Sequence, residues 1–334
     1  MSKKKHCNIP IFIPELACPH QCVFCNQEKI SNTFSVPTPN EIGVIIDSYL
    51  ETIPKSAEIN IAFFGGSFTG IPQQKMISYL KVAYKYVVEG KVQGIRISTK
   101  PDYITNPILD ILEKYGVIAI ELGAQSTNDK VLVKSGRGHK FDAIEKAANL
   151  INNRNFELGL QMMLGLPYDN LELSIQTAKD IVRLKADTTR IYPTVVVKGT
   201  VLEKMYKKGD YNVLSLEEAV SWSKEILKIF NEANIKVLRV GLHPSEELEP
   251  EKSLVAGPIH PSFKEMVLSE LWNDVLNEKQ LEKGKSIIHV AQNQLNYAIG
   301  YKGRNRNLLQ TKGYDVKFVA DKNLKDFELN VCHN

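Results

Sequence analysis

Short β-branched segments alternate with longer segments of helical periodicity between residues 9 and 241. Seven segments have the length and residue types of buried strands: Ile9–Pro14, Glu58–Phe64, Gly94–Ser98, Val117–Glu121, Glu157–Met162, Thr189–Val195 and Lys236–Gly241. Helical patterns separate them, at Pro39–Thr52, Gln73–Val87, Pro107–Lys114, Lys140–Asn152, Leu171–Leu184 and Ser215–Ala233. This alternation predicts an α/β fold with a parallel sheet, either doubly wound or curved into a barrel.

The pattern changes after Leu242–Pro261, a Pro- and Glu-rich stretch that we expect to be a loop. Apolar residues recur at helical spacing between residues 263 and 275. Beyond Lys285 the chain reads strand, helix, glycine-rich turn, helix and strand. These changes predict three parts: a barrel domain over 1–260, a connecting helix over 261–284, and a small βααβ C-terminal module over 285–334.

The composition is that of an ordinary globular protein, with 43% hydrophobic and 24% charged residues among 334. It excludes a disordered, collagenous or fibrous chain. No apolar stretch approaches the ~18 residues that span a bilayer, and no apolar signal core follows the basic N-terminus. We therefore expect a soluble, cytoplasmic protein without a membrane partner.

The net charge of +4 is too small to predict nucleic-acid binding for the whole chain. The cations are unevenly distributed, however. Between Lys283 and Lys317 there are seven cations and one anion, Asp315, so this segment carries an excess of six positive charges. A local basic patch of this kind favours an anionic partner.

Three of the five cysteines lie within eight residues, in a C-x3-C-x2-C loop formed by Cys18, Cys22 and Cys25 directly after the first strand. An odd, crowded set argues against a disulfide framework. Crowded cysteines in a cytosolic chain are typical of metal or cluster ligands. Three thiolates can hold three irons of a cubane cluster and leave the fourth iron open to a small molecule that carries an amine and a carboxylate.

The alternative for this loop is a structural zinc site. Zinc in such sites has four closed ligands, usually from paired C-x2-C units. His20 lies inside the loop, and His6 or Cys7 offers a fourth ligand, but the sequence has no second cysteine pair.

The C-x3-C-x2-C loop, with Phe24 before its last cysteine, resembles the cluster motif of the radical S-adenosylmethionine (radical SAM) superfamily. The resemblance covers roughly residues 8–260. It implies a partial (β/α)6 TIM-like barrel, a 4Fe–4S cluster on Cys18, Cys22 and Cys25, and S-adenosylmethionine (SAM) on the open iron. It also implies a reductant such as flavodoxin or ferredoxin, and cleavage of SAM to a 5′-deoxyadenosyl radical that abstracts a substrate hydrogen.

The resemblance extends to glycine turns and polar residues at the ends of the later strands. Gly65-Gly66-Ser67 is similar to the Gly-Gly-Glu motif that holds the methionine amine, with a serine in place of the glutamate. Ser98 stands where relatives often carry a glutamate. The cofactor-binding residues that the resemblance implies are Gly65, Gly66, Ser67, Ser98, Gln125, Arg137, Gln161 and Gly165.

Gln125 and Arg137 have the spacing at which a Gln and an Arg bind the methionyl group in the similar coproporphyrinogen-dehydrogenase group. An arginine can clamp a carboxylate through two parallel hydrogen bonds; the alternative is a surface cation. Because Arg137 is far along the chain from the cysteines, we expect the cluster to survive its removal. Gln161 places a polar group on a buried strand and needs a partner, and Gly165 resembles the turn that approaches adenine.

The C-terminal module resembles the core of a KH domain, whose Gly-x-x-Gly loop joins two helices and clamps a nucleic-acid backbone. Glycines permit close approach, helix N-terminal amides face phosphate, and basic side chains supply charge. The RNA-binding residues that this resemblance implies are Gly300, Tyr301, Lys302, Gly303, Arg304 and Arg306. The alternative is a helix–turn–helix with a solvated basic face.

The leading hypothesis is a radical SAM enzyme that modifies RNA, most similar to the Elongator catalytic subunit, which acts on wobble uridine in tRNA. The residues after 284 are too few for the acetyltransferase domain of that subunit, so we do not expect carboxymethylation by this chain alone. One alternative is a radical SAM enzyme with a small-molecule substrate of the coproporphyrinogen-oxidase type. Another is a non-catalytic RNA-binding protein stabilised by zinc or a cluster.

Overall fold

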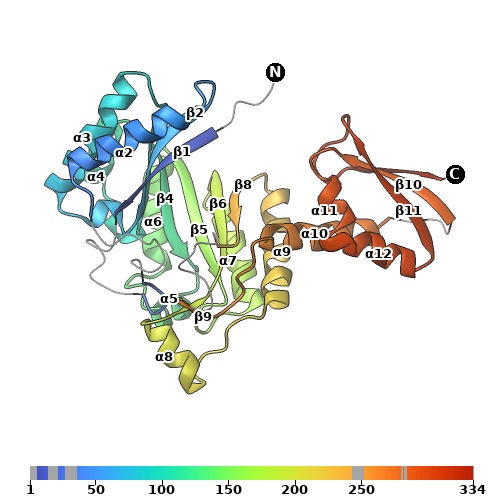
Figure 1. The fold of residues 1–334 in the computed structure, drawn as a ribbon. Helices are drawn as coiled ribbons and strands as arrows, with labels where there is room; N and C mark the ends of the chain where they lie inside the picture. The colour runs from blue at the N-terminus through green and yellow to red at the C-terminus, as the bar shows by residue number, and fades with distance from the viewer. Residues whose placement is uncertain are drawn as a thin grey trace.

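The computed structural model describes residues 6–13, 22–26, 36–242, 252–279, 281 and 284–333. Seven parallel strands form one curled sheet, a half-barrel, in the order β1-β2-β3-β4-β5-β6-β8. The strands are β1 (His6–Ile13), β2 (Glu58–Gly65), β3 (Gly94–Thr99), β4 (Val117–Gln125), β5 (Glu157–Leu164), β6 (Thr188–Pro193) and β8 (Lys236–Val240). Each strand after β1 pairs with the strand of the same sheet that precedes it along the chain, which confirms the predicted partial barrel (Figure 1).

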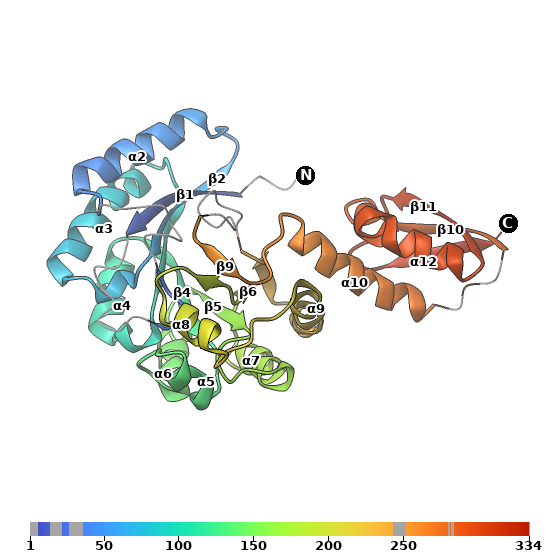
Figure 2. The ribbon, with the colours of Figure 1, turned by 60° about the horizontal axis from the view of Figure 1, so that its bottom comes forward.

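Helices cover the outer side of this sheet (Figure 2). The predicted ones are present as α2 (Pro39–Thr52), α3 (Gln73–Val88), α4 (Asn106–Lys114), α6 (Phe141–Asn152), α7 (Leu171–Arg183) and α9 (Leu216–Glu232). Two of them begin with capping boxes, in which Thr38 pairs with Glu41 and Ser215 pairs with Glu218. Each box satisfies amide donors that a helix start leaves free, and so fixes where the helix begins.

Several short elements were not predicted from the sequence. They are η1 (Phe68–Gly70), η2 (Pro101–Tyr103), α5 (Asp129–Lys134), α8 (Val201–Lys208), β7 (Val196–Val197) and β9 (Leu254–Ala256). β7 and β9 pair in antiparallel fashion. The expected loop over Leu242–Pro261 was therefore wrong at β9, where Leu254 and Ala256 pair with Val197 and Val196, a distant segment that a local pattern cannot reveal.

The inner side of the half-barrel is polar, unlike the apolar interior of a closed barrel. Arg190 donates to both oxygens of Glu121, from Nε at 2.6 Å and from Nη2 at 3.1 Å. Arg96 Nη2 lies 2.7 Å from Glu157 Oε1. Arg96 and Glu121 are buried, and pairing offsets part of the desolvation cost of these two charges.

The C-terminal module is built from β10 (Gly284–Ala291), α11 (Leu295–Ile299), η4 (Tyr301–Gly303), α12 (Arg304–Thr311), β11 (Tyr314–Asp321) and β12 (Leu329–His333). Its sheet has the order β11-β10-β12, with β10 parallel to β11 and antiparallel to β12. The predicted strand–helix–turn–helix–strand order is present, and β12 is an addition to it.

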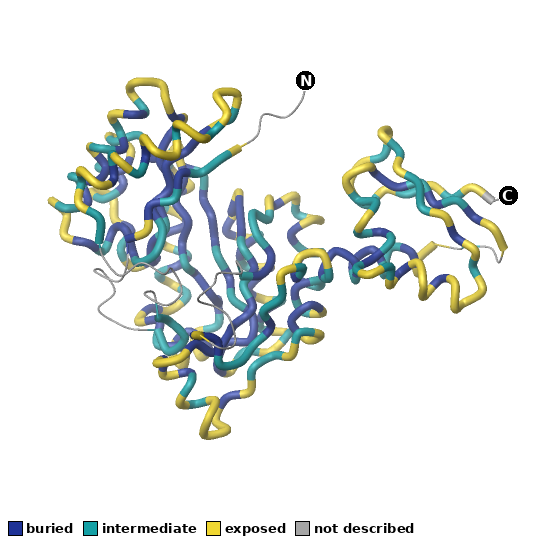
Figure 3. The backbone as a smooth tube through the Cα atoms, in the orientation of Figure 1, coloured by how far each residue is buried: buried dark blue, intermediate teal, exposed yellow. Residues whose placement is uncertain are grey.

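Helix α10 (Phe263–Asn277) joins the module to the half-barrel. Phe263 and Val267 at its start pack into the barrel core. Trp272 and Leu276 near its end pack into the core of the module. Figure 3 shows buried backbone at this junction. One helix thus belongs to two hydrophobic cores, which fixes the module to the barrel by packing rather than by a free linker.

Within the described parts of the chain, we find no helix long and apolar enough to cross a membrane.

Candidate functional site

The cysteine loop lies at the carboxyl edge of the parallel sheet. Its described part begins at Cys22; Cys18 lies outside the described residues. The amide of Val23 donates to Ser135 O at 3.1 Å, and Val23 O accepts from Leu202 N at 2.8 Å. The loop is therefore held between the end of α5 and the start of α8. The amide of Cys25 donates to Cys22 O at 3.0 Å, which closes a turn between the two cysteines.

Arg137 reaches this loop from the segment after α5. Only 5% of it is exposed. Its Nη1 donates to Cys22 Sγ at 3.1 Å, and its Nη2 donates to the carbonyl of Gly123 at the end of β4. The surface-cation alternative for Arg137 is therefore wrong. Its Nε is buried and has no partner among the described residues, so this guanidinium keeps an unused donor beside a cysteine.

Two predicted glutamines lie beside Arg137. The pairing of β4 with β5 shifts register between Gly123 and Gln125, and Gln125 has a left-handed φ of 67°. Gln161 Nε2 lies 3.4 Å from Gln125 Oε1, which supplies the partner that Gln161 requires. A Cβ on Gly123 would stand 3.0 Å from Gln125 Nε2 and 3.2 Å from Arg137 Nη2. Gly123, which the sequence did not single out, leaves the room that these two side chains occupy.

The Gly65-Gly66 pair packs on the end of β1. A Cβ at Gly65, whose φ is 106°, would lie 2.6 Å from Ile13 O, and the amide of Gly66 donates to that oxygen at 2.8 Å. Glycine is thus required for close packing against the strand that leads into the cysteine loop. Ser67 is buried at the start of η1, and Ser98 on β3 lies opposite Glu121 of β4.

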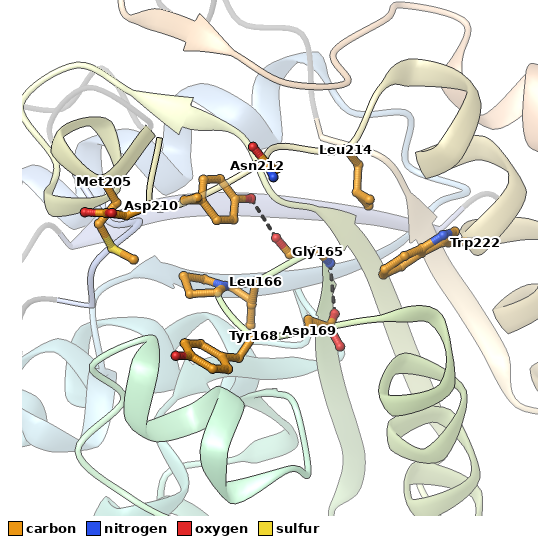
Figure 4. Close-up of a pocket in the computed structure, with 11 residues that line it drawn as sticks. Gly165, Leu166, Tyr168, Asp169, Met205, Asp210, Asn212, Leu214 and Trp222 are labelled. Carbon is orange, nitrogen blue, oxygen red and sulfur yellow. Dashed lines mark hydrogen bonds between the residues drawn. The ribbon is translucent and has the colours of Figure 1, made fainter. Parts of the chain in front are cut away.

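Gly165 follows β5 in a left-handed conformation with φ 71°. Its carbonyl accepts from Tyr211 Oη at 2.6 Å, and its amide donates to Asp169 Oδ2 at 2.9 Å. Burial raises the pKa of Asp169 to about 6, although hydrogen bonds from Ser174 and Gly165 oppose the rise. A pocket of about 220 Å³ opens at this turn (Figure 4). The sequence pattern gave no signal for Tyr211, which comes from a distant loop.

An ionic cluster holds the segments after β3 and β4 together. Asp102 Oδ2 lies 3.2 Å from Lys100 Nζ, and Asp102 Oδ1 lies 3.5 Å from His139 Nδ1. Burial acts to raise the pKa of Asp102, but His139 and Lys100 outweigh it and lower that pKa to about 2. Burial likewise lowers the pKa of His139. His139 is two residues from Arg137, so this cluster ties the segment that carries Arg137 to the segment after β3.

The candidate fourth ligands of a zinc site are far from the cysteine loop. His6 and Cys7 begin β1 at the opposite, amino edge of the sheet, and an eight-residue strand is about 25 Å long. His6 Nε2 is also only 2.8 Å from Asn60 Nδ2. In the part of the chain that the structure describes, no three His, Cys, Asp or Glu side chains gather as a metal site. Three thiolates on one loop, beside an arginine with a free donor, fit an open cluster better than zinc.

The comparisons with known proteins agree with this geometry. The Radical SAM superfamily profile matches residues 13–181, and the Radical SAM C-terminal domain profile matches residues 186–273. The chain therefore belongs to the radical SAM superfamily, a family of enzymes that bind a 4Fe–4S cluster and SAM. The resemblance inferred from the cysteine loop is confirmed.

Two proteins of one archaeal organism are similar to this chain in sequence. An uncharacterised protein of Methanocaldococcus jannaschii is 33% identical over 234 residues, which are 66% of this chain and 70% of that protein. The tRNA uridine(34) acetyltransferase of the same organism is 27% identical over 253 residues, 63% of this chain and 47% of that protein. The chain thus spans about half the length of this enzyme.

Among solved structures, the archaeal Elp3 of Methanocaldococcus infernus is similar in fold. It has a TM-score of 0.64 and 19% sequence identity, and the match covers 82% of this chain and 64% of that one. At this identity the likeness concerns the fold, and it supports the partial barrel described above.

Proposed function

We propose that this chain cleaves SAM at a 4Fe–4S cluster and uses the resulting radical to modify an RNA, in the first instance a tRNA. The observation that carries the first half of the proposal is the position of Arg137, which joins the end of β4 to the sulfur of Cys22. Residues far apart in the sequence thereby meet at the loop that would hold the cluster.

The residues have distinct roles in this proposal. Cys18, Cys22 and Cys25 hold three irons of the cluster. The buried guanidinium of Arg137 and the amide of Gln125 orient the methionyl group, while Gly65, Gly66 and Ser67 face its amine. Gln161 fixes Gln125. When bound, the cluster supplies the electron for reductive cleavage of SAM, and a carrier such as flavodoxin or ferredoxin supplies that electron from outside.

The RNA substrate is proposed from the relatives. The chain is similar in sequence to tRNA uridine(34) acetyltransferases and to Elongator complex protein 3. Since the chain spans only part of the length of these relatives, a tRNA substrate is a hypothesis for this chain. A cytoplasmic location is part of the same hypothesis.

The C-terminal module would contribute charge rather than backbone amides. The amide of Tyr301 already donates to Ser269 Oγ at 2.7 Å, and the amide of Gly303 donates to Gly300 O at 2.8 Å. Arg304 pairs with Glu270 of α10. The side chains of Lys302 and Arg306 are exposed, so we propose that they carry the phosphate contacts of this KH-like loop.

The test is anaerobic reconstitution with iron and sulfide, followed by incubation with SAM, a chemical reductant and unmodified tRNA. We expect 5′-deoxyadenosine to form, and nucleoside mass analysis of the tRNA to show a new modified nucleoside. Formation of 5′-deoxyadenosine without any change in RNA would instead support a small-molecule substrate. Stoichiometric zinc with no iron would contradict the proposal at its first step.

A further inference from the structure

Tyr168 is an exposed aromatic residue at the carboxyl edge of the sheet. It lies in the turn after β5, 55% exposed, with a left-handed φ of 69°. Bulky residues rarely adopt this conformation. The turn is held by Asp169, which accepts hydrogen bonds from the Gly165 amide at 2.9 Å and from Ser174 Oγ at 2.8 Å. The fold thus presents a large ring to solvent from a fixed backbone.

Two lysines of α5 lie over this ring. Lys130 Nζ is 4.5 Å and Lys134 Nζ is 5.1 Å from the ring centroid. They are one helical turn apart and both are exposed. Neither takes part in an ion pair with another described residue. The tyrosine is therefore bordered by two cations whose charge is not neutralised within the described structure.

The pocket of about 220 Å³ opens beside Tyr168 (Figure 4). Its walls include Pro167, Leu214 and Trp222, which offer flat or apolar surfaces, and its polar groups include Asp210 and Asn212. Drug-sized ligands occupy cavities of roughly 300–1,000 Å³. This pocket has room for a single ring system, with hydrogen-bonding groups at its edge.

The pocket also adjoins the cysteine loop. Tyr211 and Met205, which line it, belong to one apolar cluster with Val23 and Phe24. Those last two residues lie between Cys22 and Cys25. A chain bound along Lys130, Lys134 and Tyr168 would therefore pass next to the site where we propose that the radical forms.

We propose that Tyr168, Lys130, Lys134 and the adjoining pocket form a subsite for one nucleotide of single-stranded RNA. The base stacks on Tyr168 and enters the pocket, and the lysines contact the flanking phosphates. Stacking on an aromatic side chain together with nearby cations is the usual means of holding single strands. This inference rests on the proposed function, because it assumes an RNA substrate.

The test measures binding of fluorescein-labelled octauridylate and of an unmodified tRNA transcript to the reconstituted full chain at several salt concentrations. Tyr168→Ala should weaken octauridylate binding about five- to a hundredfold, since each stacked base contributes that much. Tyr168→Phe keeps the ring and should bind nearly as well as the parent. Lys130→Glu with Lys134→Glu should lower the salt slope by about 1.4, at ~0.7 per phosphate contact.

The matched control is Lys81→Glu with Lys85→Glu. These lysines are exposed at the same spacing on α3, which lies away from the cysteine loop. The control should leave RNA affinity close to that of the parent. If the two double variants lose RNA affinity equally, net charge alone governs binding, and the proposed subsite is wrong.

Two further outcomes separate this inference from the proposed function. If the parent binds tRNA and Tyr168→Ala binds it equally well, the subsite is wrong and the proposed function stands. If the parent binds neither RNA at any salt concentration, both are wrong. The same variants are titrated with SAM alone. A loss of SAM affinity in Tyr168→Ala would assign the pocket to the cofactor and overturn the subsite.

Discussion

The Gly136–Gly138 segment after α5 and the Gly300–Gly303 loop have the same signal in the sequence, a glycine next to a cation, but the structure uses them differently. In the segment after α5, Arg137 is buried with an Nε that lacks a described partner, and its Nη1 donates to Cys22 Sγ. In the C-terminal loop, the amides of Tyr301 and Gly303 are already bonded to Ser269 and Gly300.

The hydrogen-bonding state of these two regions indicates which of them is expected to hold a ligand. A buried polar atom without a partner costs free energy, so its persistence calls for a ligand, water or ion that satisfies it. Arg137 meets this criterion. The amides of Tyr301 and Gly303 do not, because their hydrogen bonds stabilise the module and its contact with α10. The exposed cations Lys302 and Arg306 are the groups that we propose for an external partner.

The largest expected effect comes from the cysteines. Replacement of Cys18, Cys22 and Cys25 by alanine should abolish iron binding, because the described residues contain no group of three His, Cys, Asp or Glu side chains that could hold a metal in their place. Iron analysis and electron paramagnetic resonance of the reduced protein measure this directly. Cys332→Ala, an exposed cysteine on β12, is the control and should retain full iron. A cubane spectrum in the triple variant would refute the ligand assignment.

The next effect concerns Arg137. Arg137→Ala removes hydrogen bonds to a charged group, which contribute roughly 1.5–3 kcal/mol, so SAM affinity should fall about ten- to a hundredfold. Isothermal titration of the reconstituted protein measures the loss. Arg137→Lys keeps the charge but not the two-pronged geometry, and should recover only part of the affinity.

The contact between Arg137 and Cys22 also predicts a change in the cluster of the Arg137→Ala variant. From sequence distance, the cluster was expected to survive the loss of Arg137, and this stays a prediction. The two sites are nevertheless close in space, because Arg137 Nη1 lies 3.1 Å from Cys22 Sγ. Hydrogen bonds to cluster sulfurs stabilise the reduced, more negative state. Arg137→Ala should therefore keep its iron but show a lower reduction potential. An unchanged potential together with unchanged SAM affinity would remove Arg137 from the site.

The barrel was predictable because its signals are local. Strand–helix alternation and the cysteine spacing each occupy a short window, and a parallel sheet then brings all strand ends to one edge. The contacts between those ends were not predictable. Tyr211 bonds to Gly165 across 46 residues, and β7 pairs with β9 across a longer gap. The sequence of one segment does not indicate which distant segment it will contact.

The site residues that could not be predicted from the sequence were missed for the same reason. Tyr168 and Asp169 lie in a turn whose composition resembles any loop, and their interest arises from burial and from a left-handed φ. The two lysines of α5 become notable only because the ring lies beneath them. These are properties of three-dimensional packing, so they appear only with the fold.

In the barrel, Asp169 should give a smaller effect, a pH-dependent change in the free energy of unfolding. Its folded pKa of about 6 lies above the value of 3.8 for a free aspartate. The folded state thus binds the proton more tightly, and stability falls as pH rises from about 4 to about 6. Asp169→Asn cannot ionise and keeps an acceptor oxygen. It should unfold at higher urea concentration at pH 8, with a gain of about 1–3 kcal/mol.

At about pH 3 the same variant should match the parent, because this pH lies below both the free value of 3.8 and the folded pKa of about 6, so the carboxyl group is largely protonated in both states. Asp210→Asn changes an exposed carboxylate of the same pocket and serves as the control for charge removal. A stabilisation of Asp169→Asn that is equal at both pH values would come from some other source than ionisation, and would contradict the argument.

The smallest effect is expected from the C-terminal loop. Tyr301→Asp with Lys302→Asp places two carboxylates at the proposed phosphate contact, and should weaken tRNA binding roughly tenfold or less and lower the salt slope by about 1. Because the ring of Tyr301 packs edge-on against His260 at 5.6 Å between centroids, Lys302→Asp alone is the cleaner variant. Lys302 is exposed at φ 54°, a conformation that aspartate tolerates. If Lys302→Asp binds tRNA as the parent does at every salt concentration, Lys302 makes no phosphate contact, and the lysines beside Tyr168 at the carboxyl edge of the barrel become the better candidates for RNA recognition.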